Sequence, residues 1–227
     1  MYLSTRCAHR MIIDAEVAVV RKMQETTGTP NFTTRGNKQV IKGIDVSHHN
    51  GIVDWQAVVD AGIEFAIIRS SYGMQSKDGM FAQGVIGAKA AGLKVGAYHY
   101  SYALSLEDAI QEARSCREII DSIGQLLELP IFFDMEDADG YKKRKGFAFD
   151  PAEITGICKA FICNIGLDCG IYASYSWLTD YIDWRSIGCA VWNAQWGQND
   201  DIKGYMWQYT DKLEIGGKLF DGNIKYE

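Results

Sequence analysis

The sequence predicts an α/β fold, namely an irregular TIM-like barrel of five βα units followed by three strands that lack helices. Three observations lead to this prediction. From residue 41 onward, short apolar segments alternate with helical ones. The apolar segments are nearly continuous, which is typical of parallel strands covered on both faces. Beyond about residue 185 three strand-like segments follow with no room for helices between them, and eight strands are enough to close a barrel.

The elements follow one another in a regular order. The first five expected strands are 41–47, 65–71, 93–101, 129–136 and 169–176. The helices expected after them are 53–62, 80–92, 105–124, 150–166 and 176–184. The last three expected strands are 189–196, 205–210 and 220–226. Helix-end residues support these ranges, since Ser105 with Asp108 forms a capping arrangement, Asp150 precedes Pro151, and Gly62 ends a helix. A doubly wound open sheet is the alternative, but no G-x-G-x-x-G motif follows the first strand.

The first 40 residues differ from the rest. Residues 11–24 can form one amphipathic helix, and a segment rich in Thr, Gly and Asn follows as a linker. We therefore divide the chain into an N-terminal appendage, 1–40, and a barrel domain, 41–227. The apolar stretch near the N-terminus is short and is interrupted by Asp14 and Glu16, so it does not resemble a signal peptide.

Composition argues against several classes of protein. The 227 residues carry a net charge of −6, whereas a nucleic-acid-binding protein is more often basic. No apolar run reaches the roughly 20 residues that a membrane span needs. Six cysteines are present without a C-x-x-C pair, so we expect buried free thiols and no zinc site. If a disulfide forms, Cys163 and Cys169 are the pair to test.

Acidic residues concentrate where the barrel would be open. In a parallel barrel, functional side chains lie at the C-terminal ends of the strands. Asp134 and Glu136 end the fourth expected strand, and because side chains alternate along a strand, they should share one face with Cα atoms roughly 6.5–7 Å apart. Like charge and apolar surroundings both raise a carboxyl pKa, so we expect Glu136 to hold a proton and Asp134 to stay ionised. Asp45 and Asp221 lie at the ends of two further strands predicted nearby.

Other interpretations of these residues are possible. The two acids could simply be solvated at a strand end, or the acids could bind a divalent metal. His48 and His49 follow Asp45, but no H-E-x-x-H or similar spacing supports metal ligation, so we expect hydrogen bonding in a loop and no metal. The basic run 141–145 is expected to be a solvated loop, with attraction of an anionic polymer as the functional alternative.

Several motifs, in this order, resemble those of glycoside hydrolase family 25, the lysozymes of phage-endolysin and bacterial or fungal muramidase type. They are KGIDVSHHNGIVDW, GLKVGAYHYS, PIFFDME, GIYASYSW, VWNAQW and WQYT with a following Asp, and they extend over roughly residues 41–227. The resemblance implies hydrolysis of the β-1,4 bond between N-acetylmuramic acid and N-acetylglucosamine in peptidoglycan. It also implies a barrel of five βα units plus three strands.

The same resemblance assigns roles to residues. Glu136 would be the proton donor, and Asp134 would stabilise the oxocarbenium-like centre or orient the acetamido group of the substrate. Asp45 and Asp221 would position and tune that pair. Substrate binding would fall to the aromatic and amide side chains Tyr98, Tyr100, Trp192, Gln195 and Gln208.

The same resemblance implies a binding partner and a site of action, and two rival functions remain. We expect bacterial cell-wall peptidoglycan as the partner, no cofactor, no nucleic acid and a monomer. The site of action would be the extracellular or periplasmic wall, reached by release from the cytoplasm as a phage-type lysin. One rival is a family 18 chitinase or endo-N-acetylglucosaminidase, which the apolar residues before Asp134 disfavour. The other is a non-catalytic glycan-binding module.

Overall fold

The computed structural model describes residues 40–227 with the exception of residue 126. The expected appendage, apart from its last residue, lies outside the described residues, as does the helix expected over 11–24. Val40 already belongs to the first strand, so the barrel begins one residue earlier than expected.

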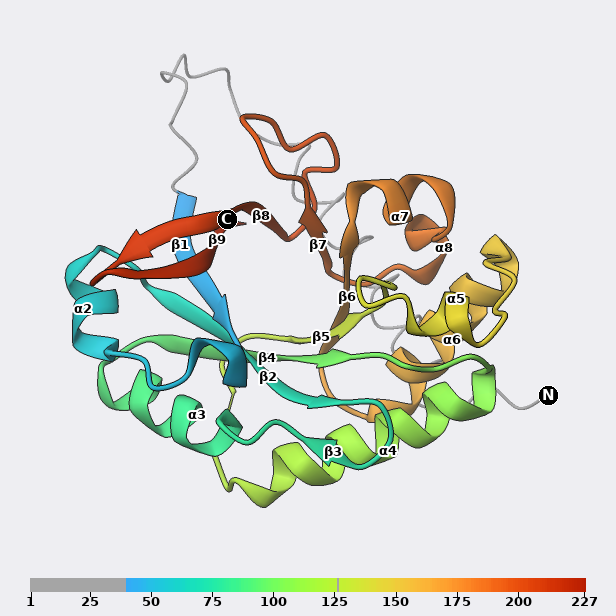
Figure 1. Cartoon of the computed structure of the whole chain (residues 1–227), viewed down its shortest axis with the longest axis horizontal. Helices are drawn as coiled ribbons and strands as arrows, with labels where there is room; N and C mark the ends of the chain where they lie inside the picture. The colour runs from blue at the N-terminus through green and yellow to red at the C-terminus, as the bar shows by residue number, and fades with distance from the viewer. Residues whose placement is uncertain (1–39, 126) are drawn as a thin grey trace, which may run out of the picture. The chain divides into compact units, whose positions relative to one another are not determined.

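Eight strands close into a barrel, as the sequence predicts (Figure 1). They are β1 (Val40–Val46), β2 (Phe65–Tyr72), β4 (Lys94–Tyr100), β5 (Ile131–Asp134), β6 (Cys169–Ser174), β7 (Val191–Ala194), β8 (Met206–Ile215) and β9 (Lys218–Tyr226). Their order around the sheet is β1-β9-β8-β7-β6-β5-β4-β2, and a β1–β2 pairing completes the ring. The short β3 (Ser76–Lys77) only pairs with the end of β2.

The helices lie where five βα units require them. They are η1 (His48–Asn50), α2 (Trp55–Asp60), α3 (Phe81–Ala90), α4 (Leu106–Ser122), α5 (Tyr141–Arg144), α6 (Pro151–Ile165), α7 (Tyr175–Asp180) and α8 (Trp184–Ile187). The expected caps are present: the Ser105 hydroxyl accepts from the Asp108 amide at 3.2 Å, and the Asp150 carboxylate accepts from the Glu153 amide at 2.9 Å. No helix is found between β7, β8 and β9 in the described residues, as expected.

The last strand runs in the opposite direction from the others. β9 is antiparallel to both of its neighbours, β8 and β1, whereas β1, β2 and β4 to β8 pair in parallel. The cause is local, since Gly216 and Gly217 both have positive φ angles and join β8 to β9 in a tight hairpin. Asp221 therefore comes to the open end of the barrel from the first half of β9, where it pairs with Asp45 of β1.

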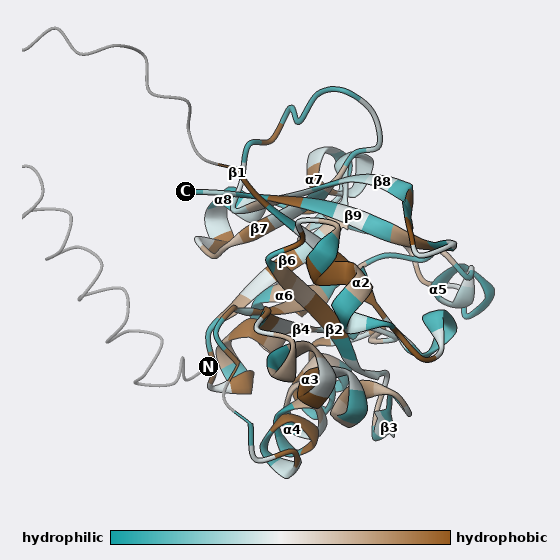
Figure 2. Cartoon of the chain, turned by 90° about the vertical axis from the view of Figure 1, so that its left-hand side faces the viewer, coloured by the Kyte–Doolittle hydropathy of each residue, from teal (hydrophilic) through white to brown (hydrophobic). Residues whose placement is uncertain are grey.

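Alternation along the strands separates two apolar layers. One layer fills the barrel and consists of Phe65, Ile67, Phe132, Trp192 and Met206. The other lies between the strands and the surrounding helices, and it takes the intervening residues, such as Ala66 and Ile68. Figure 2 shows apolar residues in the central strands and hydrophilic ones in the connecting loops. The inner layer forms the floor on which the polar residues of the open end rest.

Residues 141–145 correct one expectation. They were expected to form a solvated loop, but 141–144 form the one-turn helix α5, and the Lys142 side chain is 1% exposed. Lys143, Arg144 and Lys145 are exposed as expected. The charge pattern alone could not distinguish the buried lysine from its neighbours.

Two further expectations concern cysteines and membranes. Cys116, Cys158 and Cys169 are buried thiols, and Cys163 forms no disulfide with Cys169. None of the helices described between residues 40 and 227 combines the length and apolar character that a membrane crossing requires.

Candidate active site

A cavity of about 290 Å³ opens at the C-terminal ends of the parallel strands. Eight of the nine residues expected at the site line it, namely Asp45, Tyr98, Tyr100, Asp134, Glu136, Trp192, Gln208 and Asp221. Ser47, His49, Asn50, Arg69 and Tyr172 complete its wall. Four carboxyl groups thus share one partly enclosed space, although they are separated by up to 176 positions in the chain, from Asp45 to Asp221.

Strand register sets the arrangement of the cavity wall formed by β4, β5 and β6. Asp134, the last residue of β5, pairs with Tyr100 on β4 and with Tyr172 on β6. Phe132 lies two residues earlier on the same face and belongs to the apolar floor. An apolar strand that ends in a carboxylate therefore places Asp134 directly above the apolar floor. Glu136 follows beyond the strand end and is partly exposed, whereas Asp134 is buried.

Asp45 is held by two amides on the opposite wall. Its Oδ2 accepts hydrogen bonds from Gln208 Nε2 at 3.0 Å and from Asn223 Nδ2 at 2.7 Å. Asn223 Oδ1 in turn accepts from Trp192 Nε1 at 2.8 Å, and Gln208 Oε1 accepts from the Tyr172 hydroxyl at 3.1 Å. This network links side chains from five strands, β1, β6, β7, β8 and β9, and so fixes their orientation around the cavity.

Asn223 is a site-supporting residue that the sequence analysis missed. It is fully buried and lies two residues after Asp221, on the same face of β9. The alternation that was applied to Asp134 and Glu136 would have identified it. Arg69, near the end of β2, was not among the expected site residues, yet it lines the cavity and donates from Nε to Asp78 Oδ2 at 2.8 Å.

Gln195 is the predicted residue that the structure does not bring to the cavity. Its Nε2 donates to Asp201 Oδ2 at 2.6 Å, and its Oε1 accepts from the Asp201 backbone amide at 3.0 Å. These bonds hold the side chain within its own loop, which follows β7.

His48 and His49 lie in the short helix η1, and the His48 side chain has the polar contacts that were expected. His48 Nδ1 lies 3.0 Å from Asp78 Oδ2 and 2.5 Å from Arg69 Nη2, and His49 lines the cavity beside it. Among the residues that the structure describes, no group of three His, Cys, Asp or Glu side chains is arranged to hold a metal ion.

Burial dominates the electrostatics of the carboxyl pair. Burial raises the pKa of Glu136 to about 7, with Asp139, Asp137 and Asp221 adding to the rise and Lys142 opposing it. Burial and the neighbouring Glu136 also raise the pKa of Asp134 well above its ordinary value, and Asp134 Oδ1 is buried without a hydrogen-bond partner. The expectation that Glu136 has a raised pKa agrees with this environment, whereas burial opposes the expectation that Asp134 stays ionised. The charges that favour an ionised Asp134 are those of Lys142 and Arg69, which lower its pKa.

The pKa values of the second acid pair, Asp45 and Asp221, are also raised. Burial and then the charge of Asp221 raise the pKa of Asp45, while the bonds from Asn223 and Gln208 act in the opposite direction. Burial followed by Asp211 raises the pKa of Asp221. All four carboxyl groups thus have pKa values above their ordinary range, and the value of about 7 for Glu136 suits a general acid.

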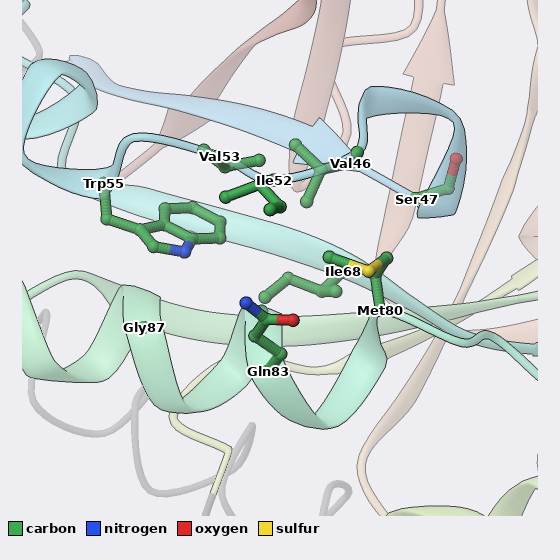
Figure 3. Close-up of a pocket in the computed structure, with 11 residues that line it drawn as sticks. Val46, Ser47, Ile52, Val53, Trp55, Ile68, Met80, Gln83 and Gly87 are labelled. Atoms are coloured by element: carbon green, nitrogen blue, oxygen red, sulfur yellow. The ribbon is translucent and has the colours of Figure 1, made fainter.

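A second cavity, of about 100 Å³, lies between the loop before α2 and the helix α3 (Figure 3). Its wall includes Trp55, Ile52, Val53, Ile68 and Met80. None of its lining residues is titratable, so proton transfer cannot take place there, and the candidate active site is the acidic cavity.

Asn223→Ala tests the network around Asp45. We expect it to lower the free energy of unfolding by about 1–3 kcal/mol, because Trp192 Nε1 and Asp45 each lose a buried partner. Urea unfolding measures the effect. Asn199→Ala, at an exposed position of the loop after β7, is the matched control and should change little. Equal stability of the two variants would contradict the proposed importance of the network.

A pair of carboxyl groups in a barrel cavity, including one whose pKa lies near neutral, is typical of glycoside hydrolases. Comparison with known proteins agrees with this class. The sequence profile described as glycosyl hydrolases family 25 matches residues 44–218, so the chain belongs to glycosyl hydrolase family 25. The match assigns it to family 25 rather than to family 18.

Individual relatives extend this comparison. The chain is 28% identical over 183 residues to an autolytic lysozyme of Clostridium acetobutylicum, covering 78% of this chain and 52% of that protein. It is 41% identical over 61 residues to lysozyme M1 of Streptomyces globisporus, covering 27% of this chain and 21% of that protein. The chain therefore spans about half or less of the length of these two relatives.

Solved structures show the same fold. The modular autolysin LytC of Streptococcus pneumoniae, in complex with a synthetic peptidoglycan ligand, superposes with a TM-score of 0.76 at 25% identity, covering 85% of this chain and 48% of that one. A family 25 glycosyl hydrolase of Bacillus anthracis superposes with a TM-score of 0.66 at 22% identity, covering 88% of this chain and 95% of that one. The second similarity supports the barrel fold and nothing beyond it.

Proposed function

We propose that this chain is a peptidoglycan hydrolase, a lysozyme of N-acetylmuramidase type that cleaves the β-1,4 bond between N-acetylmuramic acid and N-acetylglucosamine. The observation that carries the proposal is the common cavity of Asp134, Glu136, Asp45 and Asp221 at the open end of a family 25 barrel. The names of the relatives, an autolytic lysozyme and an autolysin with a peptidoglycan ligand, support the choice of substrate.

Glu136 is the proposed general acid. Cleavage of a glycosidic bond needs a proton on the leaving oxygen, and a carboxyl group with an ordinary pKa is almost fully ionised at pH 7. With its pKa raised to about 7, Glu136 is protonated in a large fraction of molecules and can still lose its proton readily. Glu136 lies beyond the end of β5, lines the cavity and is partly exposed, so a glycan bound in the cavity can reach it.

Asp134 is the proposed second carboxylate. As the leaving group departs, positive charge develops at the anomeric carbon, and an ionised Asp134 stabilises that charge or orients the substrate's acetamido group as the nucleophile. The buried Asp134 Oδ1, which has no partner among the described residues, is available for that interaction. Asp45 and Asp221 position and tune the pair.

The remaining lining residues suit a sugar. Tyr98 and Tyr100 are partly exposed in the cavity and offer flat apolar faces, Trp192 closes the floor, and Gln208 supplies amide groups. We propose that the enzyme acts on bacterial walls outside the cytoplasm.

Product analysis tests this function. We expect digestion of purified peptidoglycan to release fragments with N-acetylmuramic acid at the new reducing end, identified by borohydride reduction and mass spectrometry. If the new reducing ends are on N-acetylglucosamine, the enzyme is a glucosaminidase and the proposed muramidase activity is wrong. Tight wall binding without any new reducing end would favour the non-catalytic glycan-binding module.

A further inference from the structure

Lys142 is a buried cation next to the proposed active site. Its side chain is 1% exposed, whereas the following residues Lys143, Arg144 and Lys145 are exposed. Removing an ammonium group from water is costly unless hydrogen bonds and opposite charges compensate it. The hydrogen-bond acceptors and acidic groups around the Lys142 ammonium group therefore indicate its role.

The ammonium group bridges two strand ends. Lys142 Nζ donates to the backbone carbonyl of Glu136 at 2.7 Å and to the backbone carbonyl of Ser101. Glu136 follows β5 and Ser101 follows β4, so one side chain ties together the two segments that border the carboxyl pair. The Nζ also lies 6.0 Å from the centre of the Tyr100 ring, which is part of the cavity wall.

Further hydrogen bonds hold the start of α5, which carries Lys142, and the residue after β4, which Lys142 contacts. The Asp137 carboxylate accepts from the backbone amides of Lys142 at 2.6 Å and Lys143 at 3.1 Å, which holds the start of α5. On the other side, the Ser101 hydroxyl donates to Glu112 Oε2 at 2.8 Å. Hydrogen bonds of α5 and of the Ser101 segment therefore define the position of the lysine.

The charges around the bridge are mostly negative. Those facing Lys142 are Asp134 on β5, Glu112 on α4, and Asp137 and Glu136 in the loop before α5. Those facing Glu136 are Lys142, Asp139, Asp137 and Asp221. Those facing Asp134 are Glu136, Lys142, Asp45 and Arg69. Lys142 is thus the cation common to both carboxyl groups, although it forms no ion pair by direct contact with any described residue.

We propose that Lys142 is a positioning residue for the carboxyl pair: it clamps the Glu136 backbone to the end of β4 and supplies the positive charge that keeps one carboxyl group ionised while the other holds a proton. Without this charge, two buried acids of raised pKa would both be protonated over a wider pH range. The electrostatic part of this inference needs no substrate, and its catalytic consequence rests on the proposed function.

A titration of the free protein tests the charge. In Lys142→Met, the midpoint of Glu136, followed by carbon-13 NMR of its side-chain carboxyl and assigned with Glu136→Gln, should rise by about one pH unit, because a nearby positive charge favours the ionised form. Lys143→Met removes the same charge from an exposed neighbour and should leave the midpoint unchanged. Lys142→Arg keeps the charge and should leave it near the wild-type value.

Activity gives the second measurement. Lys142→Met should lower kcat about tenfold or more, with a smaller change in KM, and should move the pH–rate profile to higher pH. A purely structural lysine would lower the amount of folded enzyme without moving the profile. If the methionine variant does not fold, Lys142→Gln, which keeps a hydrogen-bond donor and removes the charge, gives the same readouts.

Two results separate the inference from the proposed function. A folded neutral variant whose Glu136 midpoint and pH profile both match the wild type would overturn the role of Lys142. Failure of the wild-type chain to hydrolyse peptidoglycan would overturn the proposed function, while the titration would still decide whether Lys142 controls the carboxyl pair.

Discussion

Glu136→Gln is expected to reduce the clearing of bacterial-wall suspensions by at least about a hundredfold, while binding to the walls persists. The glutamine keeps the size of the side chain but carries no proton that it can transfer to a leaving oxygen. Initial rates of turbidity loss, together with co-sedimentation of the protein with walls, measure the two properties separately. Unchanged clearing would end the assignment of Glu136 as the general acid.

A matched control and a stability measurement support this test. Glu118→Gln makes the same change at an exposed position of α4 and should clear walls as the wild type does. The folded-state pKa of Glu136 is raised to about 7 from 4.5, so the stability associated with its proton is present below about pH 4.5 and is lost as the pH rises through 7. Glu136→Gln should therefore melt at a higher temperature than the wild type at pH 8, and this difference should shrink toward pH 4.

Asp134→Asn is expected to lower the rate of wall clearing by about two to three orders of magnitude, because the developing positive charge loses its facing carboxylate. It should also move the alkaline limb of the pH–rate profile to lower pH. The charge of Glu136 raises the pKa of Asp134. Because an electrostatic interaction is reciprocal, an ionised Asp134 favours the proton on Glu136, and its removal should make Glu136 more acidic.

The comparison for this variant is Asp180→Asn, an exposed aspartate at the end of α7. It should alter neither the rate nor the pH profile. Near-wild-type clearing by Asp134→Asn would show that Asp45 or Asp221 supplies the second carboxylate. A rate loss without a shift of the alkaline limb would show that Asp134 and Glu136 do not share protons.

The local sequence determined the elements of the barrel and most of its active rim. Ser105 and Asp150 cap their helices with bonds between residues three positions apart, and the apolar strands end where polar residues begin. Such signals depend on neighbours in the chain. Because the open end of a parallel barrel collects the strand ends, the cavity could be anticipated from Asp45, Asp134, Glu136 and Asp221.

Only the tertiary structure decided how these groups are held and charged. Asn223 bonds to Asp45 across 178 positions, and Lys142 reaches the carbonyl of Ser101 across 41. Alternation along β9 can place Asn223 on the inner face, but no local pattern identifies the partner of either residue. Gln195 stays within its loop because Asp201 holds it, although its motif placed it at the site. The protons on Asp134 and Glu136 depend on burial and on charges from several strands, and burial exists only after the barrel has closed.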